Sequence, residues 1–584
     1  MRRACLFACI ALTLALPLLP VPEFWITQLN YIGMYSLVVI GLVLLTGVVG
    51  LTSFGQTAFV GIGAYAAAVL AVKAGWSPWL TLPMGLALNA GTALLLGWIT
   101  LRMSGHFLPL ATLAWGMALY YLFGNIEELG KYDGVIGIPP LSIIGVQLDT
   151  GRSYYLLVWP IVIACALLVL HLLDSRPGRA LRSLRHGSIM AEAMGVHSQR
   201  YKLLAFFIAA MLASLAGWLF AHYQRAVNPS PFGPNMGIQY LFMAVIGGVG
   251  HVWGAIAGSA VAKLLESQLQ VWLPRLLGAN GNYETVVFGV MLILVLRWGR
   301  DGLWSFVDRW LPPPRRARDW DTAAPLETRL RPTRGSELLD VRAICKQYGG
   351  LVAVNNVSLQ VRAGEIVGLI GPNGAGKTTA FNVITGVVPL TAGSVSLAGE
   401  TISGLPSREI ARRGLSRTFQ HVRMVPEMTV LENVALGCHR RGVRGTLAAM
   451  LRLDRTEERR LLREAQRQLT RVGLEDQLDQ RAGNLPLGKQ RLMEIARSLA
   501  SDPLLLLLDE PAAGLRHFEK GALAEVLRQL SGEGMSILLV EHDMDVVMGV
   551  CDRVVVMEFG THLMEGSPAE VQASPAVRAA YLGT

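Results

Sequence analysis

Charged residues are scarce in this 584-residue chain, and the scarcity is confined to one part of it. Only 16% of the residues are Asp, Glu, Lys or Arg and 52% are hydrophobic, whereas soluble proteins contain about 25% charged residues. Residues 4–311 run through Leu, Ala, Val and Gly, but from Glu337 onward the sequence has the mixed charge of a soluble α/β domain. A single soluble domain is therefore excluded, and we predict a membrane domain followed by a soluble domain.

Cysteine patterns that would hold a metal or a disulfide framework are also missing. The six cysteines have neither metal-ligand spacing nor a framework pattern, so we expect reduced, structural thiols. Nucleic acid is excluded as a partner because the net charge of +10 gathers beside apolar segments. Basic residues that flank membrane spans mark the cytoplasmic side, and here they are Arg176, Arg179, Arg182, Arg185, Arg200, Lys202, Arg315, Arg316 and Arg318.

The apolar part contains nine regions that approach the roughly 20 residues a membrane helix needs. They are residues 4–21, 30–50, 57–72, 79–101, 107–123, 154–173, 203–222, 238–262 and 283–296. The first reads as an uncleaved helix rather than a signal peptide. The basic loop at 175–202 and the soluble domain must share one side, so the stretch 238–277, broken at Gly247, Gly248 and Gly250, either crosses twice or re-enters. We predict about ten helices, with close packing at Gly250, Gly254 and Gly258.

Ionisable residues are absent from the middle of these regions, where Gln56 and Asn89 are uncharged polar residues. Ion-coupled carriers hold ionisable groups inside the membrane, so the absence favours coupling to ATP over coupling to protons. The polar run at residues 52–57 is the candidate for substrate contact.

The domain boundaries follow from composition. We predict a transmembrane domain at residues 1–311 and a soluble domain at residues 337–584. Between them, residues 312–336 contain three consecutive prolines and scattered arginines, which predicts a solvated, partly extended linker.

The soluble domain contains a phosphate-binding sequence. A short apolar stretch at residues 365–370 precedes GPNGAGKTT, and the residues from Ala380 onward are typical of a helix. Glycines in this context let backbone N–H groups curl around phosphates at a helix N-terminus. Lys377 is placed to reach the β and γ phosphates and Thr378 to offer its hydroxyl to Mg²⁺. We therefore predict ATP and Mg²⁺ as cofactors, with nucleotide contacts from Gly371, Pro372, Asn373, Gly374, Ala375, Gly376, Lys377, Thr378 and Thr379.

Three acidic or imidazole side chains follow two further apolar strands. The all-leucine run at residues 504–508 is typical of a central parallel strand, and it ends in Asp509 and Glu510. We expect Asp509 to orient Mg²⁺ and Glu510 to polarise the attacking water. His542 follows another apolar strand at residues 536–540, which places it at the same phosphate site as a second catalytic residue.

The order of these motifs resembles the nucleotide-binding domain of an ABC transporter. It runs through Tyr348, GPNGAGKTT, Gln420 in RTFQ, LPLGKQR, LLLLLDEP and VEHD. SRTFQHVRMVPEMTVLENV, DEPAAGL and EGSPAEV resemble the ATPases of branched-chain amino acid importers, and GLTSFGQTAFVGIGAYAAA, SRPGRALRSLR, AEAMGV and YKLLAFFIAA resemble their permeases. The resemblance implies an all-α polytopic membrane domain followed by an α/β P-loop NTPase domain of ABC type with a helical subdomain.

The resemblance also implies roles for residues outside the phosphate loop. Tyr348 would stack on adenine, and Gln420 would contact Mg²⁺ and link it to the membrane interface. The segment at residues 485–491 would act on ATP held by a partner subunit, through Leu485, Gly488, Lys489 and Gln490. Glu192 and Gly195 would lie on a coupling segment that docks near residues 420–427 of the ATPase.

Two departures from the family pattern fall in regions that serve the partner nucleotide. Pro486, Leu487 and Lys489 replace residues of the usual signature, and Arg516 stands where an acidic residue or Asn is usual. The second composite ATP site is therefore expected to be slower or differently tuned.

The implied function is ATP-driven import of branched-chain or related amino acids across a bacterial inner membrane, with the ATPase domain in the cytoplasm. The mechanism needs two permeases and two ATPases, so the partners are a second permease and a second ATPase, or a second copy of this chain. A periplasmic substrate-binding protein and membrane lipid complete the set. Amides, urea or aromatic acids are alternative substrates, and an exporter and an ATP-gated regulatory membrane protein are alternative functions.

Overall fold

The computed structural model describes residues 10–103, 107–277, 284–298, 302–310 and 319–582. The chain forms two compact units. The first comprises Met1–Leu173 and Gln199–Ala317, and the second comprises Asp174–Ser198 and Arg318–Thr584. We call Asp174–Ser198 the basic segment. It packs as part of the second unit, although in sequence it lies inside the predicted membrane domain.

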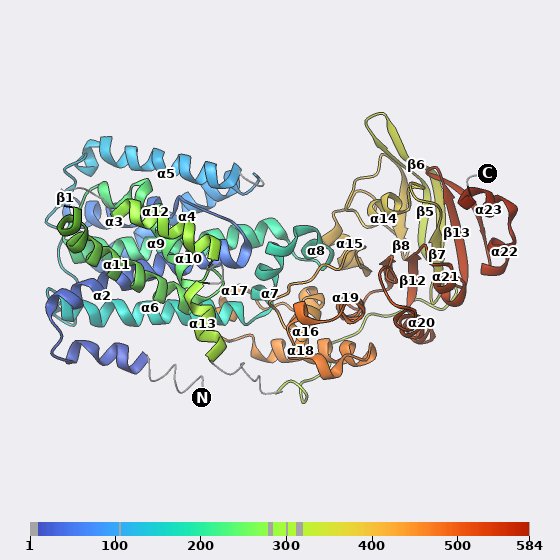
Figure 1. Cartoon of the computed structure of the whole chain (residues 1–584). Helices are drawn as coiled ribbons and strands as arrows, with labels where there is room; N and C mark the ends of the chain where they lie inside the picture. Colours follow the sequence, from blue (N-terminus) through green and yellow to red (C-terminus); the bar gives the residue numbers. More distant parts are fainter. Residues whose placement is uncertain (1–9, 104–106, 278–283, 299–301, 311–318, 583–584) are drawn as a thin grey trace. The chain divides into compact units, whose positions relative to one another are not determined.

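Apolar helices make up most of the first unit (Figure 1). This confirms the predicted all-α membrane domain, and the helix count agrees roughly with the ten predicted. The described helices are α2 Glu23–Leu42, α3 Gln56–Val72, α4 Pro78–Thr100, α5 Phe107–Asn125, α6 Gly151–Leu173, α9 Ser198–Gln224, α10 Pro234–Gly247, α11 Val252–Leu277, α12 Glu284–Trp298 and α13 Gly302–Trp310.

Helix length and hydropathy identify the segments that are able to cross a membrane. Five described helices meet both criteria, and α2 does so together with the π-helical turn η2, Val43–Val49. The pair α10 and α11 meets them only jointly and is bent by 118°. Residues 4–9 of the first predicted region and Tyr283 of the last lie outside the described residues.

The predicted break near residue 248 is present between α10 and α11. Gly248 has a φ of +106°, a left-handed conformation that favours glycine. A Cβ at Gly254 would lie 2.4 Å from the carbonyl oxygen of Gly247, and one at Gly258 would lie 2.0 Å from that of Met243. Close packing is thus confirmed at Gly254 and Gly258. It is wrong for Gly250, where a Cβ would meet nothing within 4 Å.

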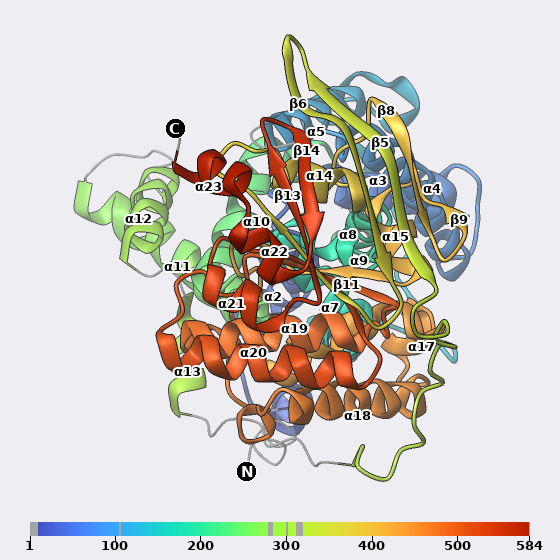
Figure 2. The same ribbon diagram turned by 90° about the vertical axis from the view of Figure 1, so that its right-hand side faces the viewer.

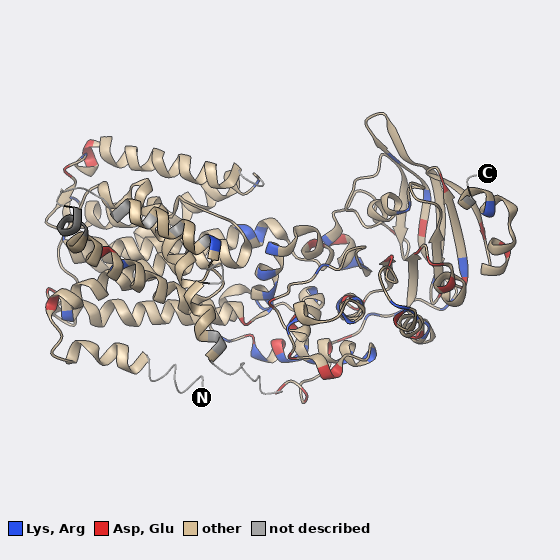
Figure 3. Cartoon of the chain, in the orientation of Figure 1, with Lys and Arg blue, Asp and Glu red and all other residues tan. Residues whose placement is uncertain are grey.

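Charged residues are sparse on the helices of the first unit (Figure 3), but α11 carries Lys263 and Glu266 in its apolar part. Lys263 and Glu266 lie within Val252–Trp272, the part of α11 that belongs to the bent apolar pair. The prediction that no ionisable residue lies within the spans is therefore wrong here. The two side chains form an ion pair of 2.8 Å, and this mutual compensation allows them to reside in an apolar helix.

The second unit contains the predicted α/β fold. Its six-stranded sheet has the order β10-β11-β12-β7-β13-β14, and all pairs except β13–β14 are parallel. These strands are β7 Ile366–Ile370, β10 Leu415–Arg417, β11 Leu505–Asp509, β12 Ser536–Val540, β13 Arg553–Glu558 and β14 Thr561–Gly566. The all-leucine strand β11 lies between β10 and β12 and is buried throughout, which confirms its predicted central position.

Two further layers surround this sheet. An antiparallel sheet is formed by β5 Glu337–Tyr348, β6 Leu351–Arg362, β8 Ala392–Leu397 and β9 Glu400–Thr401, and its long β5–β6 hairpin packs beside β14 (Figure 2). The helical subdomain contains α16 Val430–Ala435, α18 Arg455–Arg471 and α19 Leu487–Ala500, which pack on one another. α20 His517–Gly532 and α21 Met544–Val550 complete the packing of the parallel sheet.

The described part of the predicted linker is not solvated throughout. Trp320 is 1% exposed and belongs to the hydrophobic core beside α18, where its indole N–H donates to Gln466. The backbone N–H of Arg329 donates to Asp502 at 2.6 Å. The prediction of a solvated linker is therefore wrong at Trp320 and Leu326, whose side chains are buried, whereas most of residues 321–336 are exposed. Residues 312–318 of the predicted linker lie outside the described residues.

Candidate functional site

The phosphate-binding sequence forms a tight turn between β7 and α14, Lys377–Ile384. Gly371, Gly374 and Gly376 all have positive φ, of +151°, +84° and +88°. A Cβ at Gly371 would lie 2.1 Å from the carbonyl oxygen of Met557. Glycine is thus required both by the backbone conformation and by the space available.

Lys377 lies over this turn with its ammonium group directed at the backbone. Nζ donates to the carbonyl oxygens of Gly371 at 2.7 Å and Pro372 at 3.0 Å. Burial lowers the pKa of Lys377, and the nearby carboxylates of Glu510 and Asp509 act in the opposite direction. The Lys377 ammonium is therefore held against the backbone of the turn, near the carboxylates of Glu510 and Asp509.

An open pocket of about 530 Å³ lies against the turn, which is within the usual size range for a small-molecule site. It is lined by Asn373, Gly374, Ala375, Gly376, Lys377, Thr378, Thr379, Gln420 and Glu510, all predicted site residues, and by Leu351, Val352, Ala353, Phe559 and Gly560. Gly371 and Pro372 lie behind it as acceptors for Lys377.

The side of the pocket near the β5–β6 hairpin is lined by residues other than Tyr348. Tyr348 ends β5 and does not line the pocket; its ring is 47% exposed and lies 4.9 Å below the Lys346 ammonium. Phe559 lines the pocket and is 86% exposed, so it offers a second aromatic surface that the sequence reasoning missed. Its position in the turn between β13 and β14 was the available signal.

Asp509 and Glu510 lie at the carboxyl end of β11. Asp509 is buried, its Oδ2 lies 3.5 Å from the guanidinium of Arg417, and its Oδ1 has no hydrogen-bond partner among the described residues. Burial raises the pKa of Asp509 to about 6. Asp509 does not itself line the pocket, whereas Thr378 and Gln420 do. A carboxylate oxygen, a hydroxyl and an amide oxygen are oxygen ligands of the kind that a hard cation such as Mg²⁺ prefers.

Glu510 faces the pocket from a left-handed backbone conformation, with φ of +46°. Its Oε2 accepts a hydrogen bond from Gln420 Nε2 at 3.0 Å and lies 3.8 Å from His542 Nδ1. The structure thus brings together Gln420, Glu510 and His542 as predicted. His542 approaches Glu510 but does not itself line the pocket.

Glu541 is a positioning residue that the sequence reasoning missed. It is fully buried and accepts backbone N–H groups from Ala512 at 2.6 Å and His542 at 3.1 Å. It therefore ties the turn after Glu510 to the turn that carries His542. Burial raises the pKa of Glu541, and these N–H groups oppose the shift. Its place beside His542 in VEHD was the available signal.

The segment predicted to act on a partner's nucleotide is separate from this pocket. Leu485 and Gly488 are buried and Lys489 is exposed at the start of α19, and none of Leu485, Gly488, Lys489 and Gln490 lines the pocket. Arg491 on the same helix donates to the carbonyl oxygens of Phe419 and Gln420. α19 therefore fixes the backbone on which Gln420 is carried.

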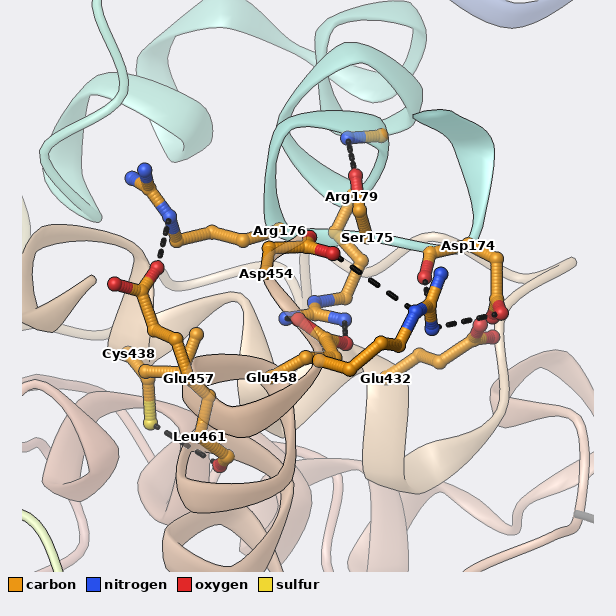
Figure 4. A network of polar contacts seen from close by, with 12 residues as sticks. Asp174, Ser175, Arg176, Arg179, Glu432, Cys438, Asp454, Glu457, Glu458 and Leu461 are labelled. Carbon is orange, nitrogen blue, oxygen red and sulfur yellow. Dashed lines mark hydrogen bonds and ion pairs between the residues drawn. The ribbon is translucent and has the colours of Figure 1, made fainter. Parts of the chain in front are cut away.

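The basic segment packs on the helical subdomain through a ladder of ion pairs (Figure 4). Arg179, on α7 Arg176–Ser183, is 1% exposed and makes a bidentate pair with Glu458 of α18, with Nη2 to Oε2 at 3.0 Å. Burial lowers the pKa of Arg179, but the Glu458 carboxylate outweighs burial and leaves the pKa above its usual value. Four further pairs join the two sides: Arg455–Asp174, Arg176–Glu457, Arg182–Glu432 and His186–Glu427.

The predicted coupling residues lie further along the basic segment. Glu192 is on α8, Ser188–Ala193, which packs on α15, Ser407–Arg413, and it accepts from Ser198 Oγ. Gly195 has φ of +80°, and a Cβ there would lie 2.3 Å from Arg440. Neither contacts residues 420–427 through a hydrogen bond or ion pair among the described residues.

Residues 420–427 meet the basic segment through other side chains. His186 Nε2 lies 3.0 Å from Glu427, and the Met190 sulfur lies 3.1 Å from Arg497, whose guanidinium also donates to Arg423. The hydrogen bond from His186 lowers the pKa of Glu427 to about 2. The predicted surface is therefore contacted directly by His186, and Met190 reaches it only through Arg497.

Comparison with known families matches both parts of the chain. Residues 25–296 match the family described as branched-chain amino acid transport system / permease component, residues 354–513 match ABC transporter, and residues 562–584 match branched-chain amino acid ATP-binding cassette transporter. The basic segment lies within the first match.

Individual proteins similar to the chain match its ATPase part. The high-affinity branched-chain amino acid transport ATP-binding protein LivG of Salmonella typhimurium is 46% identical over 249 residues, covering 42% of this chain and 98% of LivG. BraF of Pseudomonas aeruginosa, which carries the same description, is 43% identical over 249 residues, covering 42% of this chain and 98% of BraF. The crystal structure of the ADP conformation of MJ1267, an ATP-binding cassette of an ABC transporter, is 32% identical and covers 42% of this chain and 99% of that chain, with a TM-score of 0.39.

Proposed function

This chain belongs to the family of branched-chain amino acid ABC transporters, and we propose that it imports branched-chain or related amino acids. It unites a permease and an ABC ATPase in one polypeptide, and the ATPase couples ATP hydrolysis to transport. The substrate class is supported by the names of LivG and BraF and by the permease match.

One observation carries the proposed coupling. The helices α6 and α9 lead into and out of the basic segment, and that segment is bound to the ATPase by the buried Arg179–Glu458 pair. A buried charge pair resists separation, because removing either partner strands the other charge. Movement of the helical subdomain on ATP binding would therefore be passed to α6 and α9 through the chain.

In the proposed hydrolytic site, each pocket group has a distinct task. The turn at residues 371–379 and the Lys377 ammonium bind the phosphates. Glu510 polarises the attacking water, and His542, whose Nδ1 lies 3.8 Å from Glu510 Oε2, keeps the Glu510 carboxylate in position. Thr378, Gln420 and Asp509 would hold Mg²⁺, which supplies positive charge against the β and γ phosphates.

The proposal includes partners. The predicted signature residues Leu485, Gly488, Lys489 and Gln490 do not line the pocket of their own chain, which supports the view that they serve a nucleotide on another ATPase. We propose that the chain works with a second permease and a second ATPase, or with its own copy. A periplasmic substrate-binding protein would deliver substrate, and the chain would reside in a bacterial inner membrane.

Uptake into sealed membrane vesicles tests this function. Vesicles that contain the complex and trapped ATP should accumulate radiolabelled leucine when the cognate binding protein is present, and they should not do so with Glu510→Gln. Competition by unlabelled valine, urea, short amides and phenylalanine then separates the alternative substrates. ATP-dependent efflux of leucine would instead indicate an exporter, and hydrolysis without movement of any of these solutes would overturn the proposal.

A further inference from the structure

The ion pair on α11 has no role in nucleotide binding or in the ion-pair ladder. Lys263 Nζ lies 2.8 Å from Glu266 Oε2, and each side chain is 18% exposed. Charged groups within an apolar membrane segment are costly, and they commonly mark a path for a polar solute. A purely structural pair is better placed at a helix end, whereas this pair lies between Val252 and Trp272.

Aromatic rings from α2 face the cationic end of this pair. The Lys263 ammonium lies 5.6 Å from the ring centre of Tyr31 and 5.9 Å from that of Tyr35. Both distances are within the range in which a cation is attracted by an aromatic face. Since Tyr31 and Tyr35 are four residues apart on one helix, they form a continuous wall beside the charges.

An apolar cavity lies against Tyr35. Tyr35 contacts Tyr240 edge-to-face at 5.6 Å between ring centres, and both rings line a cavity of about 20 Å³. Its other lining residues include Met34, Phe220, Phe232 and Met236. The volume holds about one water molecule, so an aliphatic side chain would enter only after the flexible methionines and the rings move apart.

We propose that Lys263, Glu266 and the cavity against Tyr35 form the binding site for a zwitterionic apolar amino acid in the permease, in a closed state. The α-carboxylate would bind Lys263, the α-ammonium would bind Glu266, and the aliphatic side chain would occupy the cavity. The inference rests on the proposed import function. A zwitterion replaces one ion pair by two and adds no net charge, whereas a singly charged analogue leaves Lys263 or Glu266 unpaired.

Weak binding to the full chain in lipid nanodiscs tests this site directly. Saturation-transfer NMR near pH 7 would compare leucine with leucinamide, which lacks the carboxylate, and with 4-methylpentanoate, which lacks the ammonium. For the native chain we expect both analogues to bind about tenfold or more weakly than leucine, since each loses one charged partner.

Two variants should give crossed patterns. Lys263→Gln should weaken leucine and 4-methylpentanoate by about tenfold or more and leucinamide by less than about threefold. Glu266→Gln should weaken leucine and leucinamide by about tenfold or more and 4-methylpentanoate by less than about threefold. Because each pattern compares ligands on one sample, a loss of folded protein cannot produce it. Lys131→Gln is the matched control, since Lys131 pairs with Glu127 on an exposed surface and should leave all three affinities unchanged.

The two possible failures are distinguishable. If the native chain supports leucine uptake in vesicles but binds no ligand in nanodiscs, or if both variants keep the native order of the three ligands, the site is wrong and the import function stands. If the native complex transports urea or amides but not leucine, the import function fails and the site assignment fails with it.

Discussion

The nucleotide pocket and the ladder that holds the basic segment lie in the same unit, yet they treat charge in opposite ways. At the nucleotide site, Asp509 Oδ1 has no hydrogen-bond partner among the described residues and adjoins the pocket residue Glu510, and Phe559 is exposed beside an open volume of about 530 Å³. In the ladder, Arg179 is 1% exposed and both of its terminal nitrogens bind Glu458. One region leaves groups available for a ligand, and the other pairs each cation with a carboxylate of the same unit.

The difference reflects what each region has to do. A pocket that binds and releases nucleotide must keep acceptors and donors uncommitted between turnovers. Under the proposed coupling, the basic segment passes movement to α6 and α9 and must not detach. Removing one partner of a buried, hydrogen-bonded charge pair costs about 3–5 kcal/mol, because the other charge is left unpaired.

The largest effect is expected from Glu510→Gln in the pocket. Loss of the carboxylate removes the group proposed to polarise water, so ATP turnover by the purified complex should fall about 100-fold or more. Nucleotide binding should persist because the residue 371–379 turn is intact. Glu525→Gln on exposed α20 is the control, and turnover that is similar in both variants would remove Glu510 from the hydrolytic role.

The next effect concerns the ladder. Arg179→Met leaves Glu458 buried without its partner and should weaken packing of the basic segment by about 3 kcal/mol. Hydrogen exchange of residues 174–186 should rise accordingly. The double variant Arg179→Met with Glu458→Met removes both charges and should recover much of the protection. Arg412→Met is the control, because the Arg412 side chain is 66% exposed in its ion pair with Glu409. Equal exchange in all variants would show that the Arg179–Glu458 pair does not hold the basic segment.

A third prediction tests whether the stretch after residue 318 belongs to the ATPase unit. Trp320→Ala removes a fully buried indole beside α18 and should lower the stability of this unit by about 3 kcal/mol. Leu330→Ala, at a side chain that is 95% exposed, should have little effect. Thermal unfolding followed by nucleotide-binding capacity would compare them, and equal transitions would restore the view of a solvated linker.

The smallest effect is a pH dependence at the edge of the ladder. Since His186 lowers the pKa of Glu427 from 4.5 to about 2, the stability that this pair contributes is present above about pH 4.5 and is lost as pH falls toward 2. Because Glu427 is 58% exposed, the contribution is small, under about 1 kcal/mol. Glu427→Gln should flatten the pH dependence of hydrogen exchange at residues 186–190, and an unchanged profile would contradict the assignment.

The sequence predicted the pocket well because its residues come from short contiguous motifs at strand ends. GPNGAGKTT, Gln420 and Glu510 meet around one volume, and parallel strands bring their carboxyl ends together. Tyr348 as an adenine contact stays a prediction. Phe559 and Glu541 were missed because their importance depends on which turns meet in space.

The ladder and the α11 pair were harder to predict for a physical reason. Arg179 and Glu458 are separated by 279 residues, so no local pattern indicates that they pair, and the basic residues of this segment read equally well as a topology signal. Lys263 and Glu266 were missed because they adjoin a region whose average hydropathy is high. Trp320 was missed because proline and arginine dominate the composition around it.

The coupling ratio in sealed vesicles tests whether the basic segment carries the action of the ATPase to the permease helices. The number of leucine molecules accumulated per ATP hydrolysed would be measured for the native complex, for Arg179→Met and for the double variant with Glu458→Met. We predict that Arg179→Met lowers this ratio about tenfold or more while hydrolysis continues, and that the double variant regains most of it. An unchanged ratio in Arg179→Met would contradict the claim that the basic segment carries the action of the ATPase to the permease helices.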